Sequence, residues 1–184
     1  MNTLGAKEDD DMSKKILIIS SSIRNKSNSE ILAREAEKGA IAAGNEVEFI
    51  SLKNKDLRFC KGCLACQKTM KCVIKDDVAE IMEKVKNADT LLFATPIYYY
   101  ELCGQLKTLL DRLNPLYPQE YSFRDVYLMT ASYETGDEVV EKAVGGINGW
   151  IDGFEKARYA GIFNGGGLND MGEASNKPDV LNAA

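Results

Sequence analysis

The sequence predicts an α/β protein built as one doubly wound parallel sheet with helices on both faces. Short, continuously apolar segments alternate with amphipathic segments of helical period, and the alternation recurs about every thirty residues. This order favours right-handed β-α-β units, in which a helix crosses the sheet between two parallel strands. The chain has 184 residues, which suits a single domain.

Five segments are predicted as strands. The runs at residues 14–20 and 89–95 are apolar almost throughout, as expected for strands that are buried on both faces. Acidic and apolar residues alternate at the start of 46–52, which favours a less buried strand at an edge of the sheet. Segments 125–132 and 157–164 complete the set.

Helices are predicted between the strands from their end signals and their apolar stripes. Ser27 to Glu30 is a capping-box pattern at the start of the first helix, and Gly44 follows its end. Asp76 and Asp77 suit the start of the second. A last helix begins near Pro178. The stripes of the second to fourth helices are Val78, Ile81, Met82 and Val85; Leu102, Leu106, Leu109, Leu110 and Leu113; and Val140, Ala143, Val144, Ile147, Trp150 and Phe154.

Charge and composition exclude several classes of partner. The formal net charge is −5, so neither a nucleic acid nor an anionic membrane is an expected partner. Residues 1–13 are acidic and aperiodic, and we interpret them as a disordered or non-native extension to one domain at 14–184. Because no run is long and apolar enough for a bilayer, and no secretory signal is apparent, we expect a cytoplasmic protein.

The chain contains no histidine. This excludes histidine-based triads, histidine-ligated zinc or haem, and a histidine general base. We therefore predict no catalytic side chain and look for chemistry supplied by a bound group.

The loop after the first predicted strand, residues 20–29, fits a phosphate monoester. It holds five serines, two asparagines and two cations, and it leads directly into a helix N-terminus. Hydroxyls, free backbone amides and the helix dipole favour an anion, and Arg24 can bond a phosphate through two nitrogens. The loop lacks glycine, so it is neither a Walker loop nor a dinucleotide-binding turn. The alternative is a polar connection with an ordinary cap.

The loops after the third and fourth long strands favour a flat aromatic ligand at the same edge of the sheet. Residues 96–100 join a proline to three successive tyrosines. Tyr98 and Tyr99 could sandwich or edge a ring system, while backbone groups bond its heteroatoms. The alternative is that these tyrosines cover a helix or a dimer partner. Residues 132–136 add small donors and another aromatic side chain.

Four of the five cysteines lie within residues 60–72. Such crowding favours a metal or redox loop over structural disulfides. The loop follows the second strand, so we expect it at the same edge as the other loops. Reduced thiols or a labile disulfide are the alternatives. The fifth, Cys103, is expected to be a small core residue.

Several ordered motifs together carry a family resemblance. They are Ser-x-Arg-x-x-Ser-Asn-Ser at 22–29, Cys-x2-Cys-x2-Cys followed by Asp-Asp, Pro-x-Tyr at 96–98, and Gly-Gln-Leu-Lys before Asp-Arg. From about residue 14 to 114 the chain resembles the NAD(P)H-dependent FMN reductases of the flavodoxin-like superfamily. The resemblance implies a sheet of order 2-1-3-4-5, with the FMN phosphate in the serine-rich loop and the isoalloxazine against the tyrosines and the Ser132 loop. The predicted FMN-binding residues are Ser20, Ser22, Arg24, Ser27, Asn28, Ser29, Thr95, Pro96, Ile97, Tyr98, Tyr99, Ser132, Tyr133 and Glu134.

The cysteine motif is most similar to that of the iron-sulfur flavoproteins within this family. Four thiolates in so short a segment suit a 4Fe-4S cluster better than the separated pairs of a zinc ribbon. The predicted ligands are Cys60, Cys63, Cys66 and Cys72.

The predicted function is that of an FMN oxidoreductase, a homodimer or homotetramer, that takes electrons from NAD(P)H and passes them to a flavin, a quinone or an iron-sulfur centre. A flavin needs no histidine, since hydride transfer requires only stacked rings. One alternative is an iron-sulfur flavoprotein electron carrier reduced by ferredoxin. Another is a receiver-like signalling module, but that class needs acidic strand ends where this chain has Ser20 and Thr95.

Overall fold

The computed structural model describes residues 13–184. The predicted extension at 1–13 falls, except for its last residue, outside this range. The strands are β1 (Lys15–Ser20), β2 (Glu46–Ser51), β3 (Thr90–Tyr98), β4 (Glu101–Leu102), β5 (Asp125–Ala131) and β6 (Arg158–Gly165). The helices are α1 (Asn28–Ala42), α2 (Ala65–Thr69), α3 (Val78–Asn87), α4 (Gly104–Arg112), α5 (Glu141–Ile151) and α6 (Pro178–Ala183), with short 3-10 turns η1 (Asn114–Leu116), η2 (Asp137–Val139) and η3 (Glu173–Asn176).

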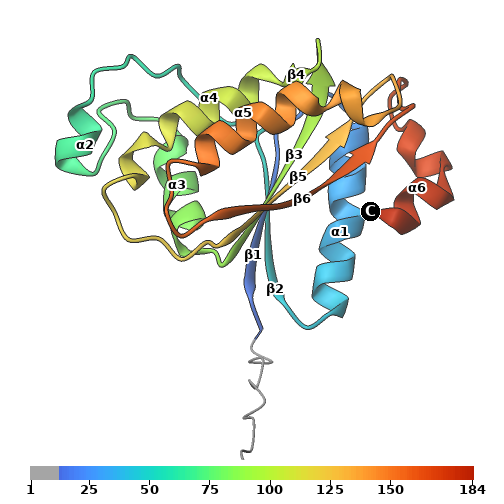
Figure 1. Ribbon diagram of the computed structural model, residues 1–184, viewed down its shortest axis with the longest axis horizontal. Helices are drawn as coiled ribbons and strands as arrows, with labels where there is room; N and C mark the ends of the chain where they lie inside the picture. The colour runs from blue at the N-terminus through green and yellow to red at the C-terminus, as the bar shows by residue number, and fades with distance from the viewer. Residues whose placement is uncertain (1–12) are drawn as a thin grey trace, which may run out of the picture.

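The five long strands form a parallel sheet in the order β2-β1-β3-β5-β6. With the two-residue β4 set aside, this is the predicted flavodoxin-like order 2-1-3-4-5. Strand β2 lies at an edge, as its alternating pattern predicted. The chain moves outward in opposite directions from β1 and β3, so the carboxyl ends of these two strands flank the point where ligands bind in such sheets (Figure 1).

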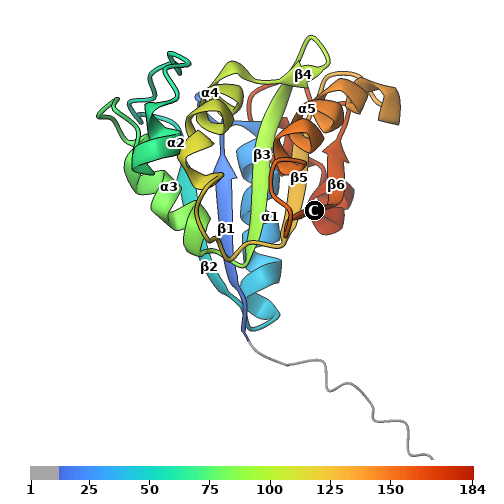
Figure 2. The same ribbon diagram turned by 60° about the vertical axis from the view of Figure 1, so that its left-hand side comes forward.

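Each face of the sheet packs against its own helices. On one face α1 contacts β1, β2, β3 and β5, and α6 lies beside α1. The other face carries α3, α4 and α5 and the larger of two apolar clusters, which includes Phe93, Leu106 and Trp150 (Figures 1 and 2). Among residues 13–184, no helix combines the length and apolar character needed to cross a bilayer.

The start of α1 is fixed where the sequence predicts it. Ser27 is the N-cap residue, and its Oγ accepts a hydrogen bond from the Glu30 amide at 3.4 Å. The reciprocal half of the capping box is absent, because the Glu30 carboxylate accepts from Ser51 Oγ instead, at 3.5 Å. At the other end Gly44 adopts φ +86°, which suits a residue that follows a helix. The helix therefore points its N-terminus at the loop that follows β1.

The chain departs from the predicted elements after residue 95. Strand β3 continues through Pro96 to Tyr98, turns at Tyr99 and Tyr100, and pairs with β4. Leu102, expected in a helix, is in β4, and α4 begins only at Gly104. Leu102 is buried in the same apolar cluster as the leucines of α4. The apolar pattern therefore could not distinguish a strand from a helix at this residue.

Candidate functional site

A hollow of about 210 Å³ lies at the carboxyl edge of the sheet, where four separate parts of the chain converge. Its lining comes from the loops after β1, β5 and β6 and from the last residues of β3 and β5. The lining residues are Ser22, Arg24, Ser27, Asn28, Ser29, Pro96, Ile97, Tyr98, Ala131, Ser132, Tyr133, Leu168 and Asn169. The fold thus brings together ten of the fourteen residues that the sequence predicts for FMN.

One end of this hollow is polar and lies against the N-terminus of α1. The side chains of Ser22, Ser27 and Ser29 are buried there, and the hydroxyls of Ser27 and Ser29 are 3.0 Å apart. The amides of the first helical turn have no carbonyl of their own helix to bond. Arg24 is exposed and uses one guanidinium nitrogen on a carbonyl, 3.0 Å from Asn169 O. The remaining donors suit an anion.

The loop after β6 was not predicted to take part, yet Leu168 and Asn169 line the hollow. The Asn28 amide nitrogen donates to Asp170 O at 2.9 Å, and its oxygen accepts from the Ala174 amide at 3.1 Å. Hydrogen bonds from Lys177 and from the amides of Asp170 and Asn169 lower the pKa of Glu173 to about 2. A glycine run at 165–167 was the only sequence signal that the loop after β6 comes close to the hollow.

A second hollow, of about 330 Å³, adjoins the first because both are lined by Ile97, Ser132 and Tyr133. Tyr99, Tyr100, Glu134 and Val139 complete its lining. Its aromatic side chains are unusually exposed: Tyr99 is 96% exposed and Tyr133 72%. Rings left in water at the mouth of a cleft are available to a flat ligand.

Two predicted residues, Ser20 and Thr95, lie beneath the cleft. Both are completely buried. Thr95 Oγ1 accepts from the Cys103 amide at 3.2 Å, and Ser20 Oγ has no partner among the described residues. Cys103 is buried as expected, although it caps α4 rather than lying within it. Ser20 ends β1, and Thr95 lies within β3; the apolar pattern of these strands does not reveal which face each hydroxyl takes.

The cysteine loop is fixed firmly at its two ends. The guanidinium of Arg112 pairs with Asp76 at 2.6 and 2.9 Å and also donates to Arg58 O at 2.6 Å. Both side chains of the pair are almost fully buried. Burial would raise the pKa of Asp76, but the hydrogen bond from Arg112 and further bonds outweigh it, and the pKa is lowered. Arg112 therefore ties together Arg58 and Asp76, which flank the cysteines on either side; we call this point the neck of the loop.

Beyond this neck the structure does not gather the four thiols. Cys60 and Cys63 are exposed, Cys72 is half-buried, and Cys66 is buried and accepts from the Asn114 amide at 3.2 Å. Throughout residues 13–184, no three Cys, Asp or Glu side chains group as metal ligands would. The loop also folds back, because α2 packs against η1 beyond the end of α4. It follows the carboxyl end of β2, at the predicted edge of the sheet, and it lies apart from the hairpin of β3 and β4 (Figure 1).

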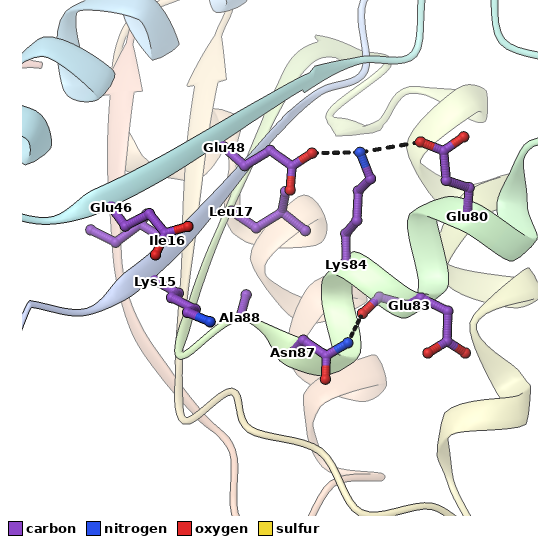
Figure 3. Close-up of a pocket in the computed structure, with 10 residues that line it drawn as sticks. All are labelled: Lys15, Ile16, Leu17, Glu46, Glu48, Glu80, Glu83, Lys84, Asn87 and Ala88. Carbon is purple, nitrogen blue, oxygen red and sulfur yellow. Dashed lines mark hydrogen bonds and ion pairs between the residues drawn. The ribbon is translucent and has the colours of Figure 1, made fainter.

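A hollow of about 400 Å³ lies between β1, β2 and α3 (Figure 3). Lys84 bridges Glu48 and Glu80 across it, at 2.5 and 3.1 Å. These two hydrogen bonds raise the pKa of Lys84. Since the lysine already satisfies both carboxylates, we assign this hollow no ligand.

The family described as NADPH-dependent FMN reductase matches residues 14–150 of the chain. The protein belongs to that family. The matched range contains the β1, β3 and β5 loops of the cleft and the whole cysteine loop.

Two relatives of the chain are named as iron-sulfur flavoproteins. The chain is 44% identical over 102 residues to an iron-sulfur flavoprotein of Methanocaldococcus jannaschii, a match that covers 55% of this chain and 53% of that one. The chain thus spans about half of that relative's length. It is 32% identical over 140 residues to an iron-sulfur flavoprotein of Methanosarcina thermophila, covering 74% and 72%.

The fold also matches solved structures at lower identity. An NAD(P)H:quinone oxidoreductase from Methanothermobacter marburgensis aligns with a TM-score of 0.73 and 18% identity, over 94% of this chain and 93% of that one. At this identity the likeness supports the flavodoxin-like fold alone.

Proposed function

We propose that the protein holds FMN in the cleft at the carboxyl edge of its sheet and transfers electrons from NAD(P)H to a second acceptor. One observation carries the proposal: a polar, cationic pocket at a helix N-terminus continues into a hollow walled by tyrosines. FMN has the same two-part chemistry, an anionic phosphate joined to a flat aromatic ring system.

The phosphate end has the donors that a dianion requires. Ser22, Ser27 and Ser29 supply hydroxyls, α1 supplies free amides and its dipole, and Arg24 supplies a charge. Two of the buried serines bond to each other, so phosphate oxygens could replace this contact without leaving either hydroxyl unpaired. The residues present therefore fit the group.

The ring end has the shape and polarity that an isoalloxazine requires. Pro96, Ile97 and Tyr98 form one stretch of wall, and Ala131 to Tyr133 form the neighbouring one, since Pro96 pairs with Ala131. Backbone groups of both walls are available to the polar edge of the ring, while the side chains supply apolar contact. Bound FMN would supply the acceptance and release of electrons, and the protein residues would orient it and limit water at its face. Ser20 and Thr95 would support this wall from beneath.

The identity of the electron donor distinguishes the leading function from its alternative, an electron carrier reduced by ferredoxin. The holoprotein is mixed under anaerobic conditions with NADH, with NADPH or with reduced ferredoxin in a stopped-flow instrument. We expect either pyridine nucleotide to bleach the flavin absorbance rapidly. Bleaching by reduced ferredoxin alone would favour the carrier and overturn the NAD(P)H-dependent reaction.

We assign the cysteine loop no step in the proposed electron transfer. The donor set has the chemistry of a 4Fe-4S site, and the relatives' names support one, but the described positions do not bring the four thiols together. Iron and acid-labile sulfide analysis of anaerobically purified protein tests the predicted ligands directly. Stoichiometric cluster would show that the loop rearranges around the metal, whereas zinc or no metal would rule out the four-cysteine cluster.

A further inference from the structure

The second hollow is crossed by one polar contact that the cleft's cofactor chemistry does not explain. Tyr100, in the turn between β3 and β4, donates its hydroxyl to Glu134 Oε2 at 2.9 Å. Glu134 belongs to the loop after β5. The bond therefore joins two walls that come from separate parts of the chain.

The turn that presents Tyr100 is strained. Strands β3 and β4 pair Ile97 with Leu102 and Tyr98 with Glu101, which leaves Tyr99 and Tyr100 as a two-residue connection. Their φ angles are +51° and +67°. A tight hairpin of this kind needs positive φ at both positions and favours asparagine and glycine there. Two tyrosines in this conformation need compensation from the surrounding structure.

Packing supplies little of that compensation. Tyr99 is almost wholly in solvent, and Tyr100 is 40% exposed. The Tyr100 ring does lie 5.6 Å from the Lys142 ammonium, within reach of a cation-π contact. The hydrogen bond to Glu134, and then its charge, raise the pKa of Tyr100.

The loop after β5, which carries Glu134, is held by β6 on the side away from Tyr100. Asn164 of β6 donates its side-chain nitrogen Nδ2 to Gly136 O at 3.2 Å, and within the loop Ser132 Oγ donates to Glu134 O at 2.8 Å. A Cβ on Gly166 would lie 3.0 Å from Glu134 O, so the loop rests closely on the end of β6. Because β6 fixes the loop after β5, the hydrogen bond between Glu134 and Tyr100 determines the distance between this loop and the turn at Tyr99 and Tyr100.

We propose that Tyr100 is a positioning residue whose hydrogen bond to Glu134 sets the width of the opening through which small electron acceptors reach the flavin. The inference rests on the proposed function, because the opening matters only if FMN occupies the cleft. Tyr100 does not itself line the phosphate pocket, so its effect is confined to access at the ring end.

Steady-state kinetics of the FMN-loaded protein test this, with NADPH as donor and 1,4-benzoquinone as acceptor. Loss of one hydrogen bond should raise the KM for quinone roughly threefold or more in Tyr100→Phe and in Glu134→Ala. In Tyr100→Phe, kcat and FMN affinity should change little. Glu134→Gln keeps an acceptor oxygen, so its KM for quinone should stay close to that of the unaltered protein. The double variant should match the single ones. Unchanged KM in Tyr100→Phe, or additive effects, would overturn the proposal.

Hydrogen exchange gives a second readout that does not depend on the flavin. In the full chain without FMN, the amides of residues 99–102 and 133–136 should exchange roughly threefold faster in Tyr100→Phe than in the unaltered protein. Tyr127→Phe, which removes an exposed hydroxyl outside the cleft, should leave them unchanged. Equal exchange in both variants would overturn the positioning role of Tyr100. A chain that takes up no FMN but shows the exchange difference would overturn only the proposed function.

Discussion

The cleft and the cysteine loop differ in how the fold treats chemically suggestive residues. Residues of the cleft are far apart in the sequence, and Asn28 bonds to Ala174 across 146 positions. The four cysteines lie within residues 60–72, yet the described structure does not gather them. Parallel strands carry their loops to a common edge whatever the sequence separation. The cysteine loop is held by the ion pair of Arg112 with Asp76 and by the contact of α2 with η1. Neither contact brings its four thiols together, although they are close in the sequence.

Replacing Arg112 with alanine should produce the largest effect, in the region that holds the cysteine loop. The change leaves the buried Asp76 carboxylate without its partner, which should lower the free energy of unfolding by about 3–5 kcal/mol. Urea denaturation measures the loss. If the loop and the cleft are separate units, the affinity for FMN should not change in the protein that remains folded.

The matched control is Lys107→Ala on the same helix, α4. Lys107 pairs with Asp111, and both side chains are about half exposed, so about 0.3–0.5 kcal/mol should be lost. Equal losses in the two variants would mean that the neck of the cysteine loop is not held by its ion pair.

Arg24→Ala probes the cleft itself. Removal of a charge-assisted hydrogen bond to phosphate should weaken FMN binding by about 1.5–3 kcal/mol, measured by fluorescence quenching during titration. Arg34→Ala, on the exposed side of α1 where Arg34 pairs with Glu37, should bind FMN normally. Full affinity in Arg24→Ala would place the phosphate elsewhere.

Gly166→Ala tests the close approach between the end of β6 and the loop after β5. The added methyl would lie 3.0 Å from Glu134 O and 3.1 Å from Thr135 Cα, and such overpacking should cost roughly 1–3 kcal/mol of stability. Gly145→Ala is the contrasting change. Gly145 lies in α5 with no atom within 4 Å of an added Cβ, so stability should rise by about 0.8–1 kcal/mol. Thermal denaturation should separate the two in sign.

Ser20→Ala should have the smallest effect and bears on a predicted cofactor residue. Its hydroxyl is buried without a partner among the described residues, so its removal should raise the free energy of unfolding by about 1 kcal/mol. FMN affinity should stay the same. Weaker FMN binding would instead support the direct contact that the sequence predicted.

Much of the fold was predictable because its signals are local. Apolar runs such as 14–20 could only be buried strands, and the capping pattern at Ser27 located the helix that supports the phosphate pocket. The strand order came from the family resemblance, and the register of the strands confirms it.

The features that sequence reasoning missed depend on contacts between distant segments. Nothing near Tyr99 and Tyr100 signals a hairpin, since such turns favour asparagine and glycine. The contribution of Asn169 rests on bonds from Arg24 and to Glu173, which no local pattern reports. The contact of α2 with η1 is likewise one that no local pattern in the cysteine loop reports.

The central claim is that the cleft accommodates a flavin by its phosphate as well as by its ring. Calorimetric titration of the purified apoprotein with FMN and, separately, with riboflavin tests it most directly. One FMN should bind per chain, and riboflavin should bind at least about tenfold more weakly, since it lacks the charge-assisted bonds of the phosphate. Equal affinity for the two, or no binding of either, would contradict the account.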